Sequence, residues 1–375
     1  MKVILLTAVN LKSTEGIYKK VLAEATALKN TVGEGWLIHA TDKGTKIVDL
    51  SNMVAEENRT NIFETAIDMI YNNHIEIIYI RHMVPSIGLI RFLSQCKHAG
   101  VKILYEIPTY PYYGEQIKAS RNKPRTILRL TYETVFWPMI YSKLDYLVVI
   151  KSNTKVKMYS KMVCITNGVD PKGIKQKSYT KCNNDIVSFV AVGTLYPYHG
   201  YDRLLYGFKK YGTEVDGKSI QLHFVGDSPT IKDLEVLSRN LELNNVYFHG
   251  VKTTAQLNEL YEDFDIGLGC LALHRRNADI DTTLKIVEYY CRSVPVVTSG
   301  ESPMDVYHPE YTIHVEDSEE PIDIIDLIHQ YSHIRNTDKI WETACDKFSW
   351  KYIMEDLMQR TNLLRSKEYV SRKND

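Results

Sequence analysis

The feature that most constrains the fold is a regular alternation of short, β-rich apolar runs with segments of helical periodicity. This alternation is typical of parallel sheets built from βαβ units. It predicts a first series of strands at residues 2–7, 36–39, 75–80, 101–106, 146–150 and 163–166. It predicts a second series at residues 186–192, 220–225, 246–249, 266–269, 294–298 and 312–315. The chain is therefore expected to be an α/β protein with two Rossmann-like units in tandem.

The expected domain limits lie where this alternation breaks. A polar, lysine-rich stretch at 171–184 separates the two series and is interpreted as an interdomain linker. We expect an N-terminal domain at 1–170 and a C-terminal domain at 171–348. Residues 349–375 include apolar side chains at helical spacing, which predict a helix that crosses back to the N-terminal domain. A chain of 375 residues is long for one core, and two domains imply a central cleft.

Composition and the chain start exclude several classes of protein. The 46 basic residues balance 46 acidic ones, so we expect no nucleic-acid partner. The six cysteines are scattered without metal-ligand spacing, and we predict no metal site. Met1 leads directly into a predicted strand without a signal-peptide pattern, which favours a cytoplasmic location. No apolar run reaches the roughly 18 to 20 residues that span a bilayer, so any membrane contact is expected to be peripheral.

The segment at 281–297, DTTLKIVEYYCRSVPVV, is the most informative for chemistry. Thr283 is a candidate N-cap for a helix that begins at Leu284. Lys285 and Glu288 then lie on one helical face, where the lysine could bind a phosphate and the carboxylate could accept hydrogen bonds from vicinal hydroxyls. The alternative is an ordinary solvated ion pair on a surface helix.

Glycines follow two predicted strands in the same half of the chain. Gly193 and Thr194 come directly after one strand, and Gly226 and Asp227 come after the next. Glycine at such turns lets the backbone approach a diphosphate closely, although glycine also commonly ends a strand. Together with the Lys285 helix, these turns predict an anion site in the C-terminal half.

Several segments together resemble family-4 glycosyltransferases of the GT-B fold, especially bacterial enzymes of capsule, O-antigen or exopolysaccharide synthesis. The segments are NGVD at 167–170, VGTL with PYHG at 192–200, FVGDSP at 224–229, LHRR at 273–276 and LKIVEYYCRSVPVV at 284–297. The resemblance covers nearly the whole chain and is strongest from about residue 145 to residue 298.

The resemblance implies an enzyme that transfers a hexose from a UDP- or GDP-sugar to a lipid-linked or glycan acceptor, with retention and without a cofactor. The acceptor would bind the N-terminal domain and the donor the C-terminal one. Glu288 matches the glutamate that contacts the donor ribose in relatives. The implied donor-site residues are Gly193, Thr194, His199, Gly226, Asp227, His274, Arg275, Thr283, Leu284, Lys285 and Glu288.

Three positions depart from the family pattern. Thr194 and His199 replace two usual cations, an arginine and a lysine, and Ile280 replaces the first glutamate of an E-x7-E pattern. The diphosphate charge would then be met by other cations. The cations are Lys285, Arg275 and Arg203, together with helix N-termini. Asp279 or Asp281 could stand in for the missing glutamate, or the LHRR stretch could do its work through His274 and Arg275.

In the N-terminal domain the candidates lie at predicted strand ends. Gly16 falls in the first strand-to-helix loop and His82 follows the third predicted strand, and both are assigned to the acceptor side. Glu106 ends a predicted strand where relatives carry a histidine near the reacting sugar. We predict catalytic roles for Glu106, Glu288 and Lys285. The alternatives are a packed helix start, a structural histidine and a buried structural carboxylate.

A basic stretch precedes an apolar, aromatic one at 118–141. The basic residues are Lys118, Arg121, Lys123, Arg125 and Arg129. Such a stretch could rest on the anionic inner face of the cytoplasmic membrane, where relatives find lipid-linked acceptors. The alternative is a basic loop followed by a buried helix.

Two other functions remain open. One is a GT-B sugar-nucleotide 2-epimerase, and the other is a non-catalytic sugar-nucleotide-binding protein, which the departures at Thr194, His199 and Ile280 make conceivable. A dehydrogenase is disfavoured because no GxGxxG motif follows the first predicted strand.

Overall fold

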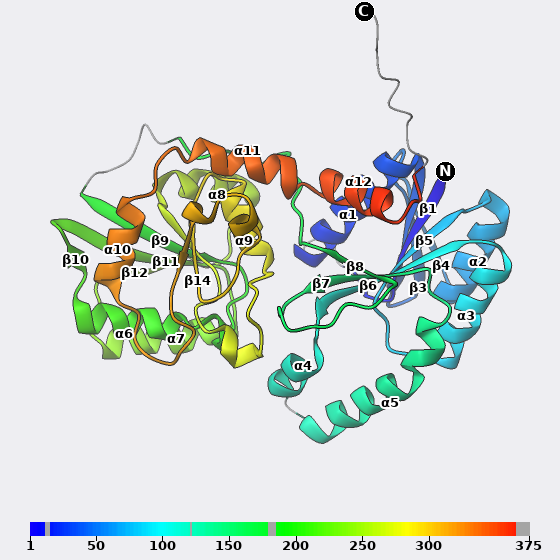
Figure 1. The fold of residues 1–375 in the computed structure, drawn as a ribbon, viewed down its shortest axis with the longest axis horizontal. Coiled ribbons are helices and arrows are strands. Elements are labelled where there is room, and N and C mark those ends of the chain that lie inside the picture. The colour runs from blue at the N-terminus through cyan, green and yellow to red at the C-terminus, as the bar shows by residue number, and fades with distance from the viewer. Residues whose placement is uncertain (12–15, 121, 179–184, 365–375) are drawn as a thin grey trace, which may run out of the picture. The chain divides into compact units, whose positions relative to one another are not determined.

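The computed structural model describes residues 1–11, 16–120, 122–178 and 185–364, and the chain divides into two compact units (Figure 1). Unit 1 comprises Met1–Lys151, Val156–Ile165 and Trp350–Asp375. Unit 2 comprises Ser152–Lys155 and Thr166–Ser349. The sequence analysis predicts domain limits after residues 170 and 348. It does not predict that the short segment Ser152–Lys155 belongs to unit 2.

The described part of unit 1 contains an eight-stranded sheet in the order β4-β3-β2-β1-β5-β6-β7-β8. Its strands are β1 (Lys2–Thr7), β2 (Glu34–Thr41), β3 (Gly44–Asp49), β4 (Ala55–Asn58), β5 (Ile77–Arg81), β6 (Lys102–Tyr110), β7 (Tyr146–Lys151) and β8 (Met162–Ile165). All neighbours pair in parallel except β2 with β3 and β3 with β4. The sequence missed β3 and β4 because this edge hairpin lacks a long apolar run, and every residue of β4 is exposed.

Both faces of this sheet are covered by helices. The helices of unit 1 are α1 (Gly16–Val32), α2 (Ile62–Asn73), α3 (Ile87–His98), α4 (Tyr113–Ala119), α5 (Lys123–Tyr141) and α12 (Trp350–Arg360). Side chains alternate across a strand, so Val3 and Leu5 pack with α1 and α12, whereas Ile4 and Leu6 pack with α2 and α3. Because helices cover both faces of the sheet, its central strands must be apolar on both faces.

Helix α12 returns from the end of unit 2 to the core of unit 1, as the sequence predicts (Figure 1). It lies against α1. Its buried side chains are Trp350, Ile353, Met354, Leu357 and Met358. The chain therefore passes between the units at four points, after residues 151, 155, 165 and 349.

The described part of unit 2 contains a seven-stranded sheet in the order β10-β11-β9-β13-β14-β15, with β12 paired to β11. Its strands are β9 (Ile186–Val192), β10 (Glu214–Val215), β11 (Lys218–Val225), β12 (Val246–Phe248), β13 (Ile266–Leu268), β14 (Val296–Thr298) and β15 (Thr312–His314). All pairs are parallel except β10 with β11. The sequence predicts six of these strands and misses the two-residue β10.

Helices cover both faces of this sheet too. They are α6 (Tyr201–Tyr211), α7 (Pro229–Asn240), α8 (Thr254–Leu260), α9 (Leu284–Tyr290), α10 (Ile324–Ser332) and α11 (Asp338–Lys347). Phe189 and Ala191 of β9 pack with α6 and α10, whereas Val190 and Val192 pack with α9 and α11.

The stretch interpreted as a linker packs on unit 2 in its described part. Lys177 is buried, and its ammonium donates to the carbonyl of Phe264 at 2.7 Å and to Asp265 at 2.8 Å. A buried lysine needs such a counter-charge. Residues 171–178 are therefore anchored, and 179–184 lie outside the described residues.

We expect Leu357→Ala to lower the free energy of unfolding by about 2–5 kcal/mol, because it leaves a cavity under α12. Chemical denaturation checks this, with the exposed Lys351→Ala on the same helix as the control. A loss no larger than that of the control would contradict the packing of α12 on unit 1.

Candidate active site

Two glycine turns lie side by side at the carboxyl ends of β9 and β11. Val192 pairs with Val225 in register, so Gly193 and Gly226 leave the sheet together. A Cβ on Gly226 would lie 2.1 Å from the carbonyl oxygen of Gly193, so only glycine allows this approach. Gly193 has φ +107, and a Cβ built there meets no atom within 4 Å. The Gly193 turn is therefore exposed, with open space at its Cα, and its role toward a diphosphate stays a prediction.

Lys285 is the second residue of α9, and its side chain contacts Tyr201 and His199. Its Nζ donates to the hydroxyl of Tyr201 at 2.7 Å, and that hydroxyl donates to the carbonyl of Leu268 at 3.0 Å. Among the described residues, no carboxylate forms an ion pair with Lys285. Burial lowers the pKa of Lys285 from its ordinary value to about 8. This ammonium is therefore poorly compensated by the protein itself.

His199 adds a second donor to the same point. The backbone N–H of Tyr196 donates to Nδ1 of His199 at 3.0 Å, so the proton of the neutral ring is on Nε2. That Nε2 lies 3.3 Å from Nζ of Lys285. Burial, with the nearby charges of Lys285 and Arg276, holds the pKa of His199 well below its usual range. Two N–H donors thus face each other with no acceptor between them, and an anion would satisfy both.

Glu288 lies on the same helix as Lys285. Its Oε1 accepts from Nη2 of Arg292 at 3.2 Å, and its side chain is 33% exposed. The other carboxylate oxygen has no hydrogen-bond partner in the part of the chain that the structure describes. Glu288 therefore offers one acceptor oxygen to a ligand bound beside α9.

Asp281 fixes the entry into α9. The helix begins at Leu284, which confirms the predicted boundary. The hydroxyl of Thr283 does not cap the helix but donates to Oδ1 of Asp281 at 2.8 Å. The other oxygen of the fully buried Asp281 accepts from the backbone N–H of Cys270 and from the hydroxyl of Thr298. Both oxygens of Asp281 are used within the protein, so it is not a free substitute for the missing glutamate.

Asp279, the other substitute considered, is also engaged. Its two oxygens accept from the backbone N–H and the hydroxyl of Thr154, both at 2.7 Å. Ile280 forms an isolated parallel bridge to Glu301. Neither neighbour of Ile280 therefore presents a free carboxylate.

Two side chains of the LHRR segment, Arg275 and His274, are already paired with carboxylates. Arg275 binds Asp202 through two hydrogen bonds, of 2.8 and 2.9 Å, and also binds Glu319. Hydrogen bonds to these two carboxylates raise the pKa of Arg275 above its usual range. His274 lies between Asp317 and Glu319, at 2.9 and 2.7 Å. Their roles toward a donor stay predictions, but their charges are compensated without one.

Arg203 is also occupied. Its guanidinium is buried and donates to the backbone carbonyls of Leu271, Glu316 and Glu320. It therefore joins loops of unit 2 together. Among the described residues, Lys285 contacts only the hydroxyl of Tyr201 and the ring of His199, so its charge is the least compensated of the predicted cations.

Glu106 lies inside β6 rather than at its end, so the predicted strand limit is wrong. The strand continues because Ile107 pairs with Val149 and Tyr110 with Lys151 of β7. Glu106 is fully buried beside its register partner Arg81, which lies 3.4 Å away. Arg81 also pairs with the buried Glu24, whose pKa burial and the charge of Glu106 raise to about 7. A catalytic role for Glu106 stays a prediction.

His82 follows β5 in unit 1. Its Nδ1 lies 3.2 Å from the hydroxyl of Tyr105, and its Nε2 lies 3.8 Å from Oε2 of the buried Glu133. Burial and the charge of Arg129 lower the pKa of His82 to about 4. Gly16 begins α1, and the residues 12–15 before it lie outside the described residues. The acceptor-side assignment of both stays a prediction.

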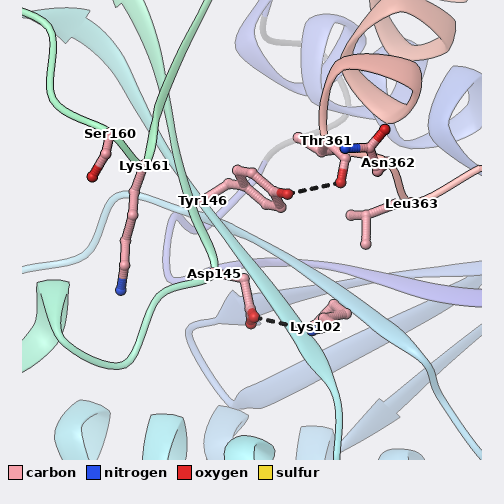
Figure 2. A pocket seen from close by; sticks show the side chains of 8 residues that line it. All are labelled: Lys102, Asp145, Tyr146, Ser160, Lys161, Thr361, Asn362 and Leu363. Atoms are coloured by element: carbon pink, nitrogen blue, oxygen red, sulfur yellow. Dashed lines mark hydrogen bonds and ion pairs between the residues drawn. The ribbon is translucent and has the colours of Figure 1, made fainter.

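A cavity of about 300 Å³ in unit 1 lies at the opposite edge of its sheet, where β6 and β7 begin (Figure 2). Figure 2 shows the hydroxyl of Tyr146 directed at the backbone carbonyl of Thr361, 2.8 Å away, and Lys102 paired with Asp145 at 3.3 Å. The hydrogen bond of Tyr146 joins the sheet to the end of α12. The described residues contain no cluster of three or more His, Cys, Asp or Glu that could hold a metal ion.

Sequence patterns missed two partners of the site. Arg292 follows Glu288 at the i,i+4 spacing of a helical ion pair, so a signal for it was available. Tyr201 is 84 residues from Lys285, and no local pattern predicts that contact.

Residues 187–330 match the family model described as glycosyl transferases group 1. This domain contains the glycine turns, His199, Lys285 and Glu288, and it supports the predicted transferase. No curated protein matches the chain in sequence.

The fold is confirmed as GT-B by its likeness to solved glycosyltransferase structures. Anabaena HepE in complex with UDP is 14% identical, with a TM-score of 0.64 over 97% of this chain and 100% of that one. Its complex with UDP-glucose gives a TM-score of 0.62 at 15% identity, with the same coverage of both chains. Sucrose-phosphate synthase from Thermosynechococcus elongatus is 15% identical, with a TM-score of 0.63 over 96% and 98%. The lipopolysaccharide outer core galactosyltransferase WaaB is 12% identical, with a TM-score of 0.61 over 97% and 100%.

We expect Lys285 to titrate near pH 8, well below an ordinary lysine, because its buried ammonium lacks a carboxylate partner. Nuclear magnetic resonance of ¹³Cε-labelled lysine checks this, and Lys285→Met identifies the signal. Between pH 8 and 10.5 the unfolded chain keeps this proton and the folded protein releases it, so Lys285 destabilises the fold below pH 8 and progressively less above it. A titration of the assigned signal above pH 10 would contradict the described environment.

Proposed function

We propose that the chain is a retaining glycosyltransferase that transfers a hexose from a UDP-sugar to a lipid-linked or glycan acceptor in bacterial surface polysaccharide synthesis. The observation that carries this proposal is the convergence of two donors, Nε2 of His199 and Nζ of Lys285, beside the free acceptor oxygen of Glu288. A nucleoside diphosphate combines the two complementary groups, an anion and a vicinal diol. The choice of uridine is supported by the UDP and UDP-glucose complexes of HepE.

The diphosphate is assigned to the corner between the Gly193 turn and Lys285. A phosphate oxygen there accepts from His199 and from Lys285, which resolves the contact between two donors. The open space at Gly193 lets the backbone approach the same group. His199 thus serves as a neutral hydrogen-bond donor where relatives have a lysine, and the departure from the family pattern is compatible with donor binding.

The ribose is assigned to Glu288. Its unpaired oxygen accepts hydrogen bonds from vicinal hydroxyls, and a carboxylate is a strong acceptor for them. Lys285 and Glu288 lie three residues apart on α9, so one helix contacts both the phosphate and the sugar of the nucleotide.

In the proposed step the bond between the anomeric carbon and the β-phosphate oxygen breaks. A bond from the acceptor hydroxyl oxygen to the anomeric carbon forms on the same face, and the hydroxyl proton passes to the leaving diphosphate. Negative charge grows on the diphosphate, where Lys285 and His199 stabilise it. In this proposal these side chains do the work that a metal ion does elsewhere.

Helix α5 of unit 1 is proposed to dock on an anionic membrane. The apolar side chains at i, i+4, i+7 and i+11 of this helix are exposed, with Leu128 at 72% and Val135 at 66%; the set is Leu128, Tyr132, Val135 and Met139. Lys123 and Arg125 are exposed at the start of the same helix. Arg121 lies outside the described residues, and Arg129 pairs with the buried Glu133. The alternative of a buried apolar helix is wrong for this stripe.

An apolar stripe with a basic end fits the interface of an anionic bilayer, where the stripe enters the acyl boundary and the cations meet headgroups. The described residues contain no helix that is long and apolar enough to cross a membrane. A lipid-linked acceptor would be reached from such a surface, and WaaB, a lipopolysaccharide galactosyltransferase, has the same fold.

We expect UDP to raise the melting temperature of the protein, because a ligand that binds only the folded state stabilises it. Lys285→Met and Glu288→Gln should each weaken UDP binding at least about tenfold, since each removes a charged hydrogen bond. Calorimetric titration with UDP, and hydrolysis of UDP-glucose and UDP-galactose, check this.

Lys232→Met and Glu235→Gln on α7 are the matched controls for this experiment. Glu288→Gln is chosen over alanine because it keeps a hydrogen-bond acceptor for the buried Arg292. Absence of any shift with UDP-, GDP-, ADP- and dTDP-sugars would overturn the proposal, whereas binding without turnover on any acceptor would favour the non-catalytic alternative. Deuterium exchange at the sugar C2 would instead reveal an epimerase.

We expect sedimentation with phosphatidylglycerol vesicles, and this binding should fall strongly in the double variant Leu128→Asp/Val135→Asp. Lys123→Gln/Arg125→Gln should weaken it in a salt-dependent way. Val306→Asp, at a residue 82% exposed in unit 2, is the matched control. If the unmutated protein stays in the supernatant, the membrane proposal is wrong.

A further inference from the structure

Arg292 is a fully buried arginine directly beside the candidate ribose-binding carboxylate. Its guanidinium carbon lies 4.1 Å from the ring centroid of Tyr261, and its Nη1 donates to Oδ1 of Asn258 at 2.7 Å. Its Nη2 donates to Oε1 of Glu288 at 3.2 Å. Among the described residues, Glu288 is the carboxylate that pairs with this charge.

These contacts fix the guanidinium from three directions. The ring of Tyr261 sets its plane, the amide of Asn258 holds one end, and the other end is left for Glu288. A buried guanidinium needs a counter-charge, so it favours one orientation of the Glu288 carboxylate. Since Oε1 is occupied by Arg292, Oε2 is the oxygen left for a ligand.

We propose that Arg292 is a positioning residue that holds the carboxylate of Glu288 in one orientation and thereby makes the site selective for nucleotides with a vicinal ribose diol. The inference rests on the proposed function, because it requires that Glu288 contacts the donor. Arg292 itself does not touch the ligand in this scheme. Its effect on binding passes through the carboxylate of Glu288.

The contacts of Arg292 indicate that it positions Glu288 and does not merely stabilise the core of unit 2. The polar partners of the Arg292 side chain are Asn258 and Glu288, and neither is in the apolar core of unit 2. Methionine has a comparable length and can pack on the ring of Tyr261, so Arg292→Met leaves no buried charge behind. Replacement of a buried ion by an apolar side chain of similar volume is often well tolerated.

The test compares UDP with 2′,3′-dideoxy-UDP, which lacks the diol, in calorimetric titrations of the full chain. We expect Arg292→Met to bind UDP about tenfold more weakly and to bind dideoxy-UDP as the unmutated protein does. The preference for the diol should fall to that of Glu288→Gln. Asn258→Ala, which releases one anchor of the guanidinium, should move the preference in the same direction. Arg239→Met on the surface of α7 is the matched control.

A double variant distinguishes action through Glu288 from a separate effect. If Arg292 acts through Glu288, Arg292→Met has no further effect on UDP affinity in the Glu288→Gln background. An unchanged diol preference in Arg292→Met, or an equal loss of both nucleotides, overturns the inference while the proposed function stands. Failure of the unmutated protein to bind UDP, or full diol preference in Glu288→Gln, overturns both.

Discussion

The parallel pairing of β9 with β11 and with β13 is the constraint on which the candidate site depends. It brings the carboxyl ends of these strands to one edge, so Gly193 and Gly226 turn away from the sheet together. The hydroxyl of Tyr289 accepts from the backbone N–H of Val192, which ties α9 to the end of β9. This contact places α9 beside the end of β9, directly before the Gly193 turn.

The charges of the site are arranged without full internal compensation. Lys285 is held by the hydroxyl of Tyr201 and faces the N–H of His199, whereas Arg275 and Arg203 are saturated by carboxylates and carbonyls. A cation that has lost water without gaining an anion is a costly arrangement, and a ligand anion relieves it. Arg292 and Glu288, in contrast, compensate each other's charge. Oε1 of Glu288 pairs with Arg292, which orients the carboxylate and leaves Oε2 for a ligand.

Much of the fold was predictable because buried parallel strands must be apolar on both faces. The limits of β1 and β9 agree with the sequence pattern, whereas the exposed hairpin of β3 and β4 left no such pattern. Glu106 was predicted to end a strand, yet β6 continues past it to Tyr110 with an irregular register against β7. Local composition does not reveal which residues a neighbouring strand will pair.

The sequence by itself determined the two α/β units, the returning C-terminal helix, the glycine turns and the helix that begins at Leu284 with Lys285 and Glu288 on it. These features depend on neighbours in the chain, where periodicity, glycine and caps act. Only the tertiary structure decided which charges have partners inside the protein. Arg275 pairs with Asp202, and Asp281 accepts from Cys270 and Thr298, whereas Lys285 contacts the neutral hydroxyl of Tyr201. Those contacts join residues from 11 to 84 positions apart, and their energy depends on burial and distance that exist only after folding.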